Sequence, residues 1–338
     1  MIKNITIIGK HAFIRCNELK SISIPSSVES IGEAAFGECS KLENVSFEKE
    51  SKLTTISKSA FDSCNELKSI SIPSSVESIG ERAFFYCSKL ENVSFEKESK
   101  LTTINNFTFQ YCRELKLISI PSSIKSIGEA AVYNCSKLEN VLFEKESKLT
   151  TINNSAFQRC EELKLISIPS SVESIGIKGF HYCPKLERVL FENESKLTII
   201  DKSAFQYCRE LKLISIPSSV KSIGEAAFHY CPKLEIVLFG NESKLATIDN
   251  SAFESCKELK SISIPSSVKS IGANAFCNCS KLERVLFGNE SKLTTINNST
   301  FKSCEKLKSI SIPSSVESIG ERAFFFLLFK IRKCFIWK

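Results

Sequence analysis

The 338-residue chain has few of the residues from which catalytic and metal centres are built: three histidines, one methionine and one tryptophan. His11, His181 and His229 are far apart, and no serine lies in a Gly-x-Ser-x-Gly turn, so a serine–histidine–acid triad is not expected. The glycines stand singly, which excludes a Gly-rich phosphate loop. We therefore predict a protein that is not an enzyme and that holds no metal and no cofactor.

Long hydrophobic runs and concentrated charge are also lacking. No window approaches the ~20 apolar residues of a membrane-spanning helix, and residues 1–9 do not resemble a secretory signal. The net charge of +7 is spread over mixed lysine and glutamate segments such as residues 48–52. Because basic residues do not cluster, no nucleic-acid partner is expected. The 42% hydrophobic content still suffices for a core.

One sequence unit is copied along the whole chain. The string Ile-Pro-Ser-Ser recurs at one constant interval, with its proline at Pro25, Pro73, Pro121, Pro169, Pro217, Pro265 and Pro313. Each 48-residue repeat contains two related halves, exemplified by residues 28–47 (the Gly coil) and residues 53–72 (the Ser/Asn coil). The offset in residue number from one half to the next alternates between 25, the longer step, and 23, the shorter step.

Each half has the same local pattern. It ends in Leu-x-x-Ile-x-Ile or a close variant, whose period of two predicts a short strand. The turn at Gly32, for which glycine supplies a permissive backbone, and the residues after it predict a short helical or 3₁₀ arm.

A coil of ~24 residues cannot bury its apolar face alone, so the copies are expected to stack with equivalent side chains about 4.8 Å apart. The predicted fold is an α/β repeat solenoid of about 14 coils. It is a right-handed leucine-rich-repeat superhelix with a parallel β-sheet on the concave face and short helical or 3₁₀ arms on the other side. Residues 1–324 form this solenoid and residues 325–338 a non-repeat apolar and basic tail. Phenylalanine marks one column, interrupted by valine: Phe13, Phe36, Phe61, Phe84, Phe109, Val132, Phe157, Phe180, Phe205, Phe228, Phe253, Phe276, Phe301 and Phe324.

Thirteen of the 15 cysteines occupy a second column, which begins Cys16, Cys39, Cys64 and Cys87. Only one close cysteine pair exists, at positions 277 and 279, which does not make a zinc knuckle. Cα atoms about 4.8 Å apart could form disulfides, but parallel Cβ vectors do not suit the ~90° torsion of a disulfide. We therefore predict a column of small buried thiols packed beside the phenylalanine column.

The outward positions of the predicted strands change from serine at both ends of the chain to leucine in its middle. The leucines are Leu117, Leu142, Leu165, Leu190, Leu213, Leu238 and Leu286. Arg188 and Arg284, with Asn140 and Ile236 in the same column, flank this stripe. An exposed apolar stripe of this length often marks a contact site, which favours a protein partner. The alternative is that recent duplication copied one Ser-to-Leu change through the central repeats without a partner.

The pattern Ser-Ile-Gly-x-x-Ala-Phe-x-x-Cys-x-x-Leu-x-x-Ile-x-Ile-Pro-x-Ser-Val, found at residues 30–47 and 61–76, resembles the BspA-like leucine-rich-repeat family of bacterial and protozoan surface antigens. The resemblance covers about residues 5–324. It implies a curved, non-catalytic solenoid that binds proteins of a host surface or matrix, at the cell surface or after secretion. Because no signal peptide is visible, a cytoplasmic protein-interaction scaffold is the alternative.

The tail after Phe324 leaves three alternatives open. It could cap the last coil, insert at a membrane interface with Trp337 and the basic residues at the headgroups, or mark a truncated gene. No polar cap is evident at the N-terminus, so the open ends also predict end-to-end self-association.

Overall fold

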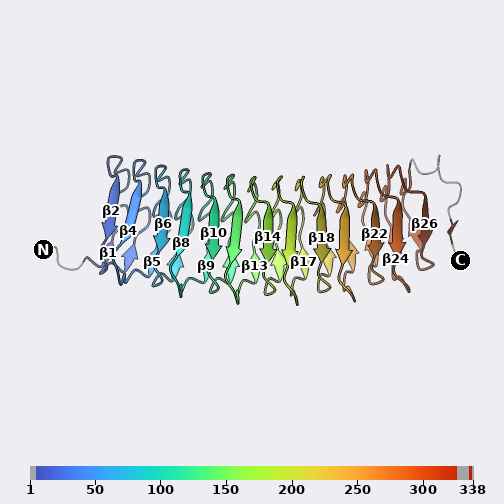
Figure 1. Ribbon diagram of the computed structural model, residues 1–338, viewed down its shortest axis with the longest axis horizontal. Coiled ribbons are helices and arrows are strands. Elements are labelled where there is room, and N and C mark those ends of the chain that lie inside the picture. The colour runs from blue at the N-terminus through green and yellow to red at the C-terminus, as the bar shows by residue number, and fades with distance from the viewer. Residues whose placement is uncertain (1–4, 326–334, 337–338) are drawn as a thin grey trace. The chain divides into compact units, whose positions relative to one another are not determined.

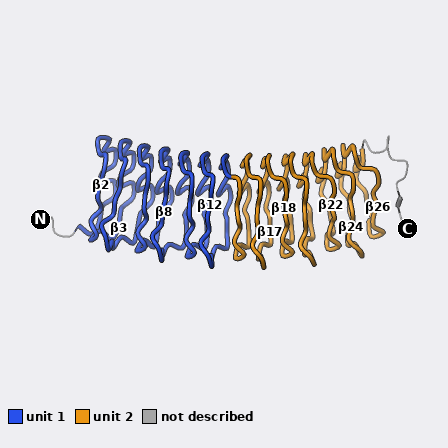
Figure 2. Tube along the Cα trace, in the orientation of Figure 1, with its two compact units in different colours: residues 1–163 blue, residues 164–338 orange. Residues whose placement is uncertain are grey.

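The computed structural model describes residues 5–325 and 335–336. Most of the predicted tail, and Trp337 with it, therefore lies outside the described residues. The chain divides into two compact units, residues 1–163 (unit 1) and residues 164–338 (unit 2), shown in Figure 2. Each unit is a stack of coils in which equivalent strands pair in parallel (Figure 1).

Unit 1 contains one row of four-residue strands and one row of two-residue strands. The four-residue strands are β2 (Ser21–Ile24), β4 (Asn44–Phe47), β6 (Ser69–Ile72), β8 (Asn92–Phe95), β10 (Leu117–Ile120) and β12 (Asn140–Phe143). The two-residue strands are β1 (Ile7–Ile8), β3 (Ser30–Ile31), β5 (Thr55–Ile56), β7 (Ser78–Ile79), β9 (Thr103–Ile104), β11 (Ser126–Ile127) and β13 (Thr151–Ile152).

Unit 2 repeats this arrangement. Its four-residue strands are β14 (Leu165–Ile168), β16 (Arg188–Phe191), β18 (Leu213–Ile216), β20 (Ile236–Phe239), β22 (Ser261–Ile264), β24 (Arg284–Phe287) and β26 (Ser309–Ile312). Its two-residue strands are β15 (Ser174–Ile175), β17 (Ile199–Ile200), β19 (Ser222–Ile223), β21 (Thr247–Ile248), β23 (Ser270–Ile271), β25 (Thr295–Ile296), β27 (Ser318–Ile319) and β28 (Phe335–Ile336). Strand β28 pairs in parallel with β26.

The prediction of helical or 3₁₀ arms is wrong, because the described residues contain no helix of either kind. Residues with positive φ recur in the arms, for example Ala34 (47°) and Glu38 (58°), and such residues interrupt a right-handed helix. The arm is instead a series of tight turns. Its alternate N–H groups donate to the next coil, as when Phe36 N donates to Ala60 O over 2.8 Å. The arm is therefore hydrogen-bonded between coils as well as within its own turns.

The role expected for the glycine of each Gly coil, such as Gly32, also needs correction. None of the described glycines has a positive φ, so a permissive turn backbone is not what the repeat glycine provides. A Cβ placed on Gly224 would lie 2.7 Å from Lys202 N and 2.8 Å from Asp201 C, in the preceding coil. Glycine is required here because two backbones approach closely.

Columns of identical side chains fill the core of each unit. The rings of Phe61 and Phe84 are stacked with centroids 5.3 Å apart and 2° between their planes. Val132 occupies the same column and is fully buried. Beside it, the column thiols donate to carbonyls of the preceding coil, as Cys64 Sγ does to Phe36 O over 3.2 Å. The column cysteines of the described chain are all free thiols. All of them are buried except Cys16, which is exposed.

The pairing of the four-residue strands alternates along each unit. Strands joined by the shorter step pair over all four positions, as β22 and β24 do from Ser261↔Arg284 to Ile264↔Phe287. Strands joined by the longer step pair only at their first one or two positions, as β24 and β26 do at Arg284↔Ser309 and Val285↔Ile310. The longer loop after each Gly-coil strand separates the strand ends. In unit 2 a depression, here called a notch, lies between the end of β16, β20 or β24 and the four-residue strand that follows.

Candidate protein-binding surface

The seven leucines of the predicted stripe all lie on the four-residue strands with their side chains on the outer face. Leu117 and Leu142 belong to unit 1 and the other five to unit 2. Their exposed fractions lie between 38% for Leu165 and 57% for Leu286, except that Leu213 is half-buried. Successive side chains of a strand point to opposite faces, which explains this exposure. In β16 and β20, for example, the residue before the exposed leucine is buried.

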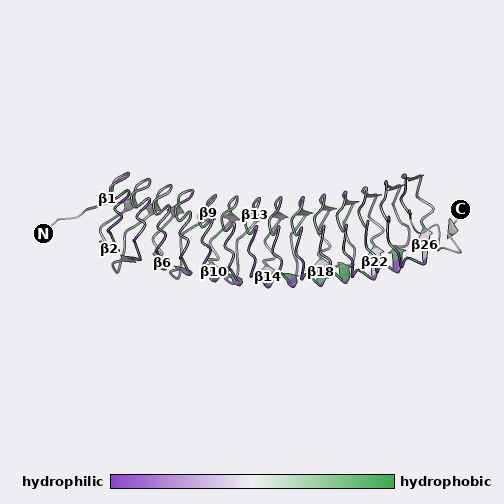
Figure 3. Ribbon diagram, turned by 90° about the horizontal axis from the view of Figure 1, so that it is seen from above, coloured by the Kyte–Doolittle hydropathy of each residue, from purple (hydrophilic) through white to green (hydrophobic). Residues whose placement is uncertain are grey.

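In unit 2 these leucines form part of a wider apolar surface. Leu213 pairs directly with the exposed Ile236, and Leu238 lies two residues further along β20 on the same face. Figure 3 shows hydrophobic colouring on the strands near β14, β18 and β22. We call Leu165, Leu190, Leu213, Ile236, Leu238 and Leu286 the leucine face. Large side chains gathered in this way on a rigid sheet provide the kind of area that protein partners bury.

Two arginines lie within this surface without a partner. Arg188 is flanked in the sheet by Leu165 on one side and Leu213 on the other. Neither Arg188 nor Arg284 makes an ion pair within the described part of the chain. Near Arg188 the charges just before the strands are paired, as in Lys212–Glu187 (3.4 Å), and the same holds for Lys260–Glu235 (3.2 Å) before β20 and β22. Both guanidinium groups are therefore without an ion pair beside exposed leucines of the sheet.

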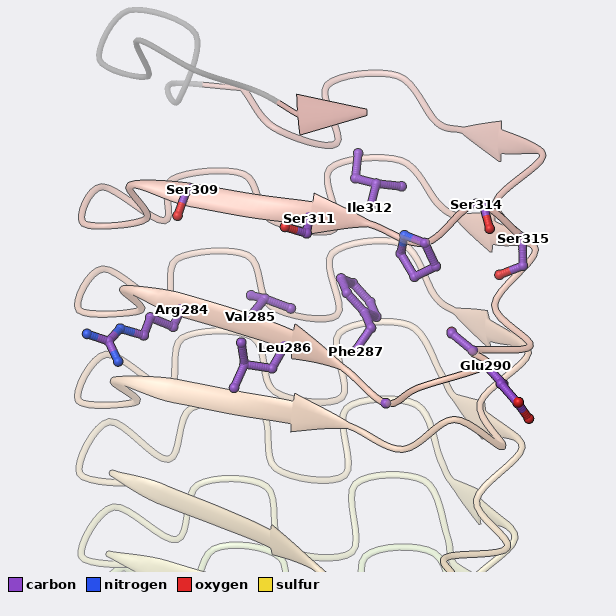
Figure 4. A pocket seen from close by; sticks show the side chains of 13 residues that line it. Arg284, Val285, Leu286, Phe287, Glu290, Ser309, Ser311, Ile312, Ser314 and Ser315 are labelled. Carbon is purple, nitrogen blue, oxygen red and sulfur yellow. The ribbon is translucent and has the colours of Figure 1, made fainter. Parts of the chain in front are cut away.

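The notch between β24 and β26 has a volume of about 540 Å³ (Figure 4). Arg284 stands at the beginning of its lining and Glu290 at the end, with Leu286 and Phe287 between them on the Gly-coil side. The opposite side consists mainly of serines, including Ser309, Ser311 and Ser314, together with Ile312 and Pro313. This arrangement can bind a ligand that combines apolar groups with charge.

The structure separates the sequence-predicted residues into a surface set and a core set. The structural columns Phe36, Phe61, Phe84, Cys39, Cys64 and Cys87 are fully buried. They hold the coils in register and do not reach the leucine face. Leu286 is separated from Leu238 by one serine strand, since it pairs with Ser263 of β22. The two unit 1 leucines lie on adjacent strands β10 and β12.

Sequence reasoning missed two features of unit 2. Ile199 on β17 is 42% exposed, although threonine stands at this position in β5, β9, β13, β21 and β25. Gly240 and Gly288 stand where the earlier repeats have glutamate, at residues 48, 96, 144 and 192. Both changes are visible once the repeats are aligned. The significance of the two glycines depends on the coils that pack against them, which the sequence does not show.

Each unit also carries an aromatic cluster on its arms. In unit 1, the Tyr86 and Tyr111 rings lie 5.7 Å apart and the Arg113 guanidinium 5.7 Å from the Tyr86 ring. In unit 2, Tyr182 and Tyr207 are 6.2 Å apart with Arg209 beside them. Because the arginines already contact the rings, these clusters are accounted for by packing within the unit.

Two further kinds of feature, metal sites and membrane-spanning helices, are absent from the described residues. Within residues 5–325 and 335–336, no cluster of three or more histidine, cysteine, aspartate or glutamate side chains is arranged to hold a metal ion. Over the same described ranges, no helical segment has the length and hydropathy needed to cross a membrane.

The chain matches the family model described as a BspA type leucine-rich repeat region (6 copies) over residues 6–139, 94–212 and 198–330. A leucine-rich repeat protein from Bacteroides ovatus is similar in structure, with a TM-score of 0.75, 29% identity, and coverage of 99% of this chain and 88% of that chain. No curated protein matches the chain.

Two further solved structures show similarity of fold alone. A leucine-rich repeat protein from Eubacterium ventriosum has a TM-score of 0.51 and 23% identity, covering 95% of this chain and 84% of that chain. The pneumococcal vaccine antigen PcpA has a TM-score of 0.53 and 23% identity, covering 94% of this chain and 79% of that chain.

Proposed function

The chain belongs to the BspA-type leucine-rich repeat family, and from that premise we propose that it is an adhesion scaffold that binds a host-surface or matrix protein through its leucine face. The family resemblance supports the cell surface as the place of action, since the family is a group of surface antigens. Leucine-rich-repeat scaffolds act by binding rather than by catalysis, and the function of this one has to be sought in the side chains that its strands display.

The observation that carries the proposal is the exposed leucine face of unit 2. Its leucines replace serines that the same fold accepts at equivalent positions, for example Ser46 and Ser94. The coils therefore do not need leucine there to fold. The exposed leucines lose their contact with water only when a partner covers them.

A triple substitution tests this proposal. Leu165→Ser, Leu190→Ser and Leu213→Ser together should leave the far-ultraviolet circular dichroism spectrum unchanged. They should reduce binding to intact host cells and to a panel of immobilised matrix proteins at least tenfold, because each leucine contributes burial of about 1.5–3 kcal/mol when fully covered. Surface plasmon resonance measures the effect on the purified proteins.

Ile199→Ser is the matched control. Ile199 is also an exposed aliphatic residue of unit 2, but it lies on β17 in the row of two-residue strands. Its substitution should leave binding unchanged. Equal binding by the triple variant and the wild-type chain would exclude the leucine face as the contact surface.

The cellular location distinguishes adhesion from the second candidate, an intracellular interaction scaffold, which the buried free thiols favour. Membrane-impermeant biotinylation of intact producing cells should label the chain if it acts in adhesion. Protection from labelling in intact cells, with labelling after lysis, would support the intracellular scaffold instead.

A further inference from the structure

The three notches of unit 2 that open after β16, β20 and β24 grow along the chain. Their volumes are about 210, 340 and 540 Å³. The corresponding residue after the strand is Glu192 in the first notch, Gly240 in the second and Gly288 in the third. The two notches with glycine at this position differ in volume from each other, so the glycine alone does not set the volume.

Glutamate at this position has a defined structural partner. Glu192 Oε2 accepts a hydrogen bond from Ser170 N over 3.0 Å, and Glu48, Glu96 and Glu144 make the same bond in unit 1. Gly288 provides no carboxylate, and the amide of Ser266 faces it, since a Cβ on Gly288 would lie 2.8 Å from Ser266 N. Ser266 belongs to the preceding coil and lines the notch after β20, so a glutamate at position 288 would place its carboxylate on the β22 side of β24.

A second difference concerns the first residue of the strand. Arg284 begins β24, whereas Ile236 begins β20 and Arg188 begins β16. Among these three notches, the one after β24 alone combines an unpaired arginine, an exposed leucine and the glycine. Glu290 supplies a negative charge at the opposite end of the lining (Figure 4).

These features define the chemistry of a ligand. A guanidinium binds a carboxylate through two parallel hydrogen bonds, and Leu286, Phe287, Ile312 and Pro313 provide an apolar wall next to it. The notch follows the strand direction, and beyond Val285↔Ile310 the two strands no longer pair, which suits an extended peptide. A second acidic residue near Glu290 would be repelled.

We propose that the notch between β24 and β26 binds an extended peptide segment of the partner, with an acidic side chain at Arg284, an apolar side chain two residues along the peptide at Leu286 and no acidic residue near Glu290. This inference rests on the proposed protein-binding function and names the partner chemistry for one part of the same face. The volume of about 540 Å³ lies within the range of ligand-binding pockets.

Fluorescence anisotropy of the full chain with labelled peptides tests the notch. The probe is Thr-Asp-Thr-Leu-Thr-Thr, whose Asp and Leu lie on one face of the extended chain, and the two comparison peptides are Thr-Lys-Thr-Leu-Thr-Thr and Thr-Asp-Thr-Leu-Thr-Asp. The probe should bind saturably, and both comparison peptides should bind at least tenfold more weakly. Absence of saturable probe binding, or equal binding of the lysine peptide, would overturn the proposal.

Substitutions then locate the binding. Arg284→Gln and Leu286→Ser should each weaken probe binding at least tenfold, because the first removes the guanidinium and the second the exposed apolar side chain of the notch. Arg188→Gln is the matched control, since it removes an equally unpaired arginine from the strand beside the smallest notch, and it should change binding less than twofold. Circular dichroism and the urea midpoint verify that each variant is folded.

The two proposals can fail separately. If the chain binds a matrix protein through Leu165, Leu190 and Leu213 while the probe does not bind, the notch proposal is wrong and the adhesion proposal stands. If Arg284→Gln and Arg188→Gln weaken probe binding equally, the effect is a general loss of positive charge and the notch is not the site. Probe binding without any cell or matrix binding would contradict the adhesion function and retain the peptide site.

Discussion

In this fold, residues other than glycine adopt the positive φ angles for which other proteins commonly use glycine. The first of the two turns in each arm places residues such as Ala34, Ser59, Arg82, Ala130 and Ala226 in the left-handed region, and a non-glycine residue there costs about 1–2 kcal/mol. Glycine occupies a different position, two residues earlier, where coils approach closely. The close approach of backbone atoms in adjacent coils, rather than a positive φ, therefore determines the position of the glycine.

Two substitutions in one coil separate these effects. Ala226→Gly should stabilise the chain by about 0.5–1 kcal/mol, since the strain at φ 55° is relieved and only part of the gain is lost to the greater freedom of the unfolded chain. Gly224→Ala should destabilise it by about 1–3 kcal/mol, because the new Cβ would meet backbone atoms of the preceding coil. Urea unfolding measures both. A loss of stability in Ala226→Gly would contradict this explanation of the arm.

The thiol column links stability to alkaline pH. Burial raises the pKa of the Cys231 thiol to about 12 and also raises the pKa of Cys208, whereas the same thiols in an unfolded chain titrate near a pKa of about 8.5. Because the folded pKa is the higher one, the unfolded state loses its protons first. The stabilisation is complete below about pH 8.5 and is lost as the pH rises toward about 12.

Removing two thiols should therefore make the alkaline loss of stability less steep. In Cys208→Ala with Cys231→Ala, the slope of the free energy of unfolding between about pH 9.5 and 11 should decrease by about 1.4 kcal/mol per pH unit for each thiol. Urea midpoints across this range provide the measurement. The wild-type chain measured over the same pH range is the reference. An unchanged slope in the double variant would show that the column thiols ionise as readily in the folded state as in the unfolded state.

At the scale of the strands and arms, the alternation of the shorter and the longer step is the main determinant of the surface. Full pairing across the shorter step makes strand pairs such as β18 and β20, and in unit 2 the partial pairing across the longer step coincides with the notches after β16, β20 and β24. Leucines placed on these strands become a face, and residues just after the strands become notch linings. The same substitution therefore has a different consequence at the middle of a strand and at its end.

The arms were the element that sequence patterns described incorrectly. Their apolar spacing, with alanine and phenylalanine following the glycine, is compatible with a short helix. Stacking instead offers alternate arm N–H groups a carbonyl in the next coil, as for Ala227 O, which accepts from Phe205 N over 2.8 Å. A hydrogen bond between coils satisfies the backbone at each level of the stack, so the arm forms turns even at the cost of left-handed residues.

On the scale of the whole molecule, repeats that contact only their neighbours should behave as a quasi-linear array. Unit 2 illustrates this, because each strand pairs with the coil before and the coil after it. Stability then depends on the number of coils and on the interfaces between them. It does not require a particular copy of the repeat.

Deleting one repeat, residues 218–265, tests this property. The deletion joins Pro217 to Ser266 and preserves the Ile-Pro-Ser-Ser sequence at the junction. The variant should fold with the same circular dichroism per residue, and the denaturant dependence of its unfolding should decrease by about one seventh, in proportion to the surface removed. Size-exclusion chromatography verifies that it is not aggregated. Failure to fold would show that the deleted coils are individually indispensable.

The sequence alone determined the repeat, the stacking of like side chains, the buried thiol column and the family, because period and residue type are local properties that recur in every copy. It also identified the leucines as outward-facing, since a strand has a period of two. Only the tertiary structure decided that the arms are turns, that glycine serves the approach of two coils, and that the sheet opens once in each repeat. Each of these depends on the distance between backbones in different coils, which no single repeat contains.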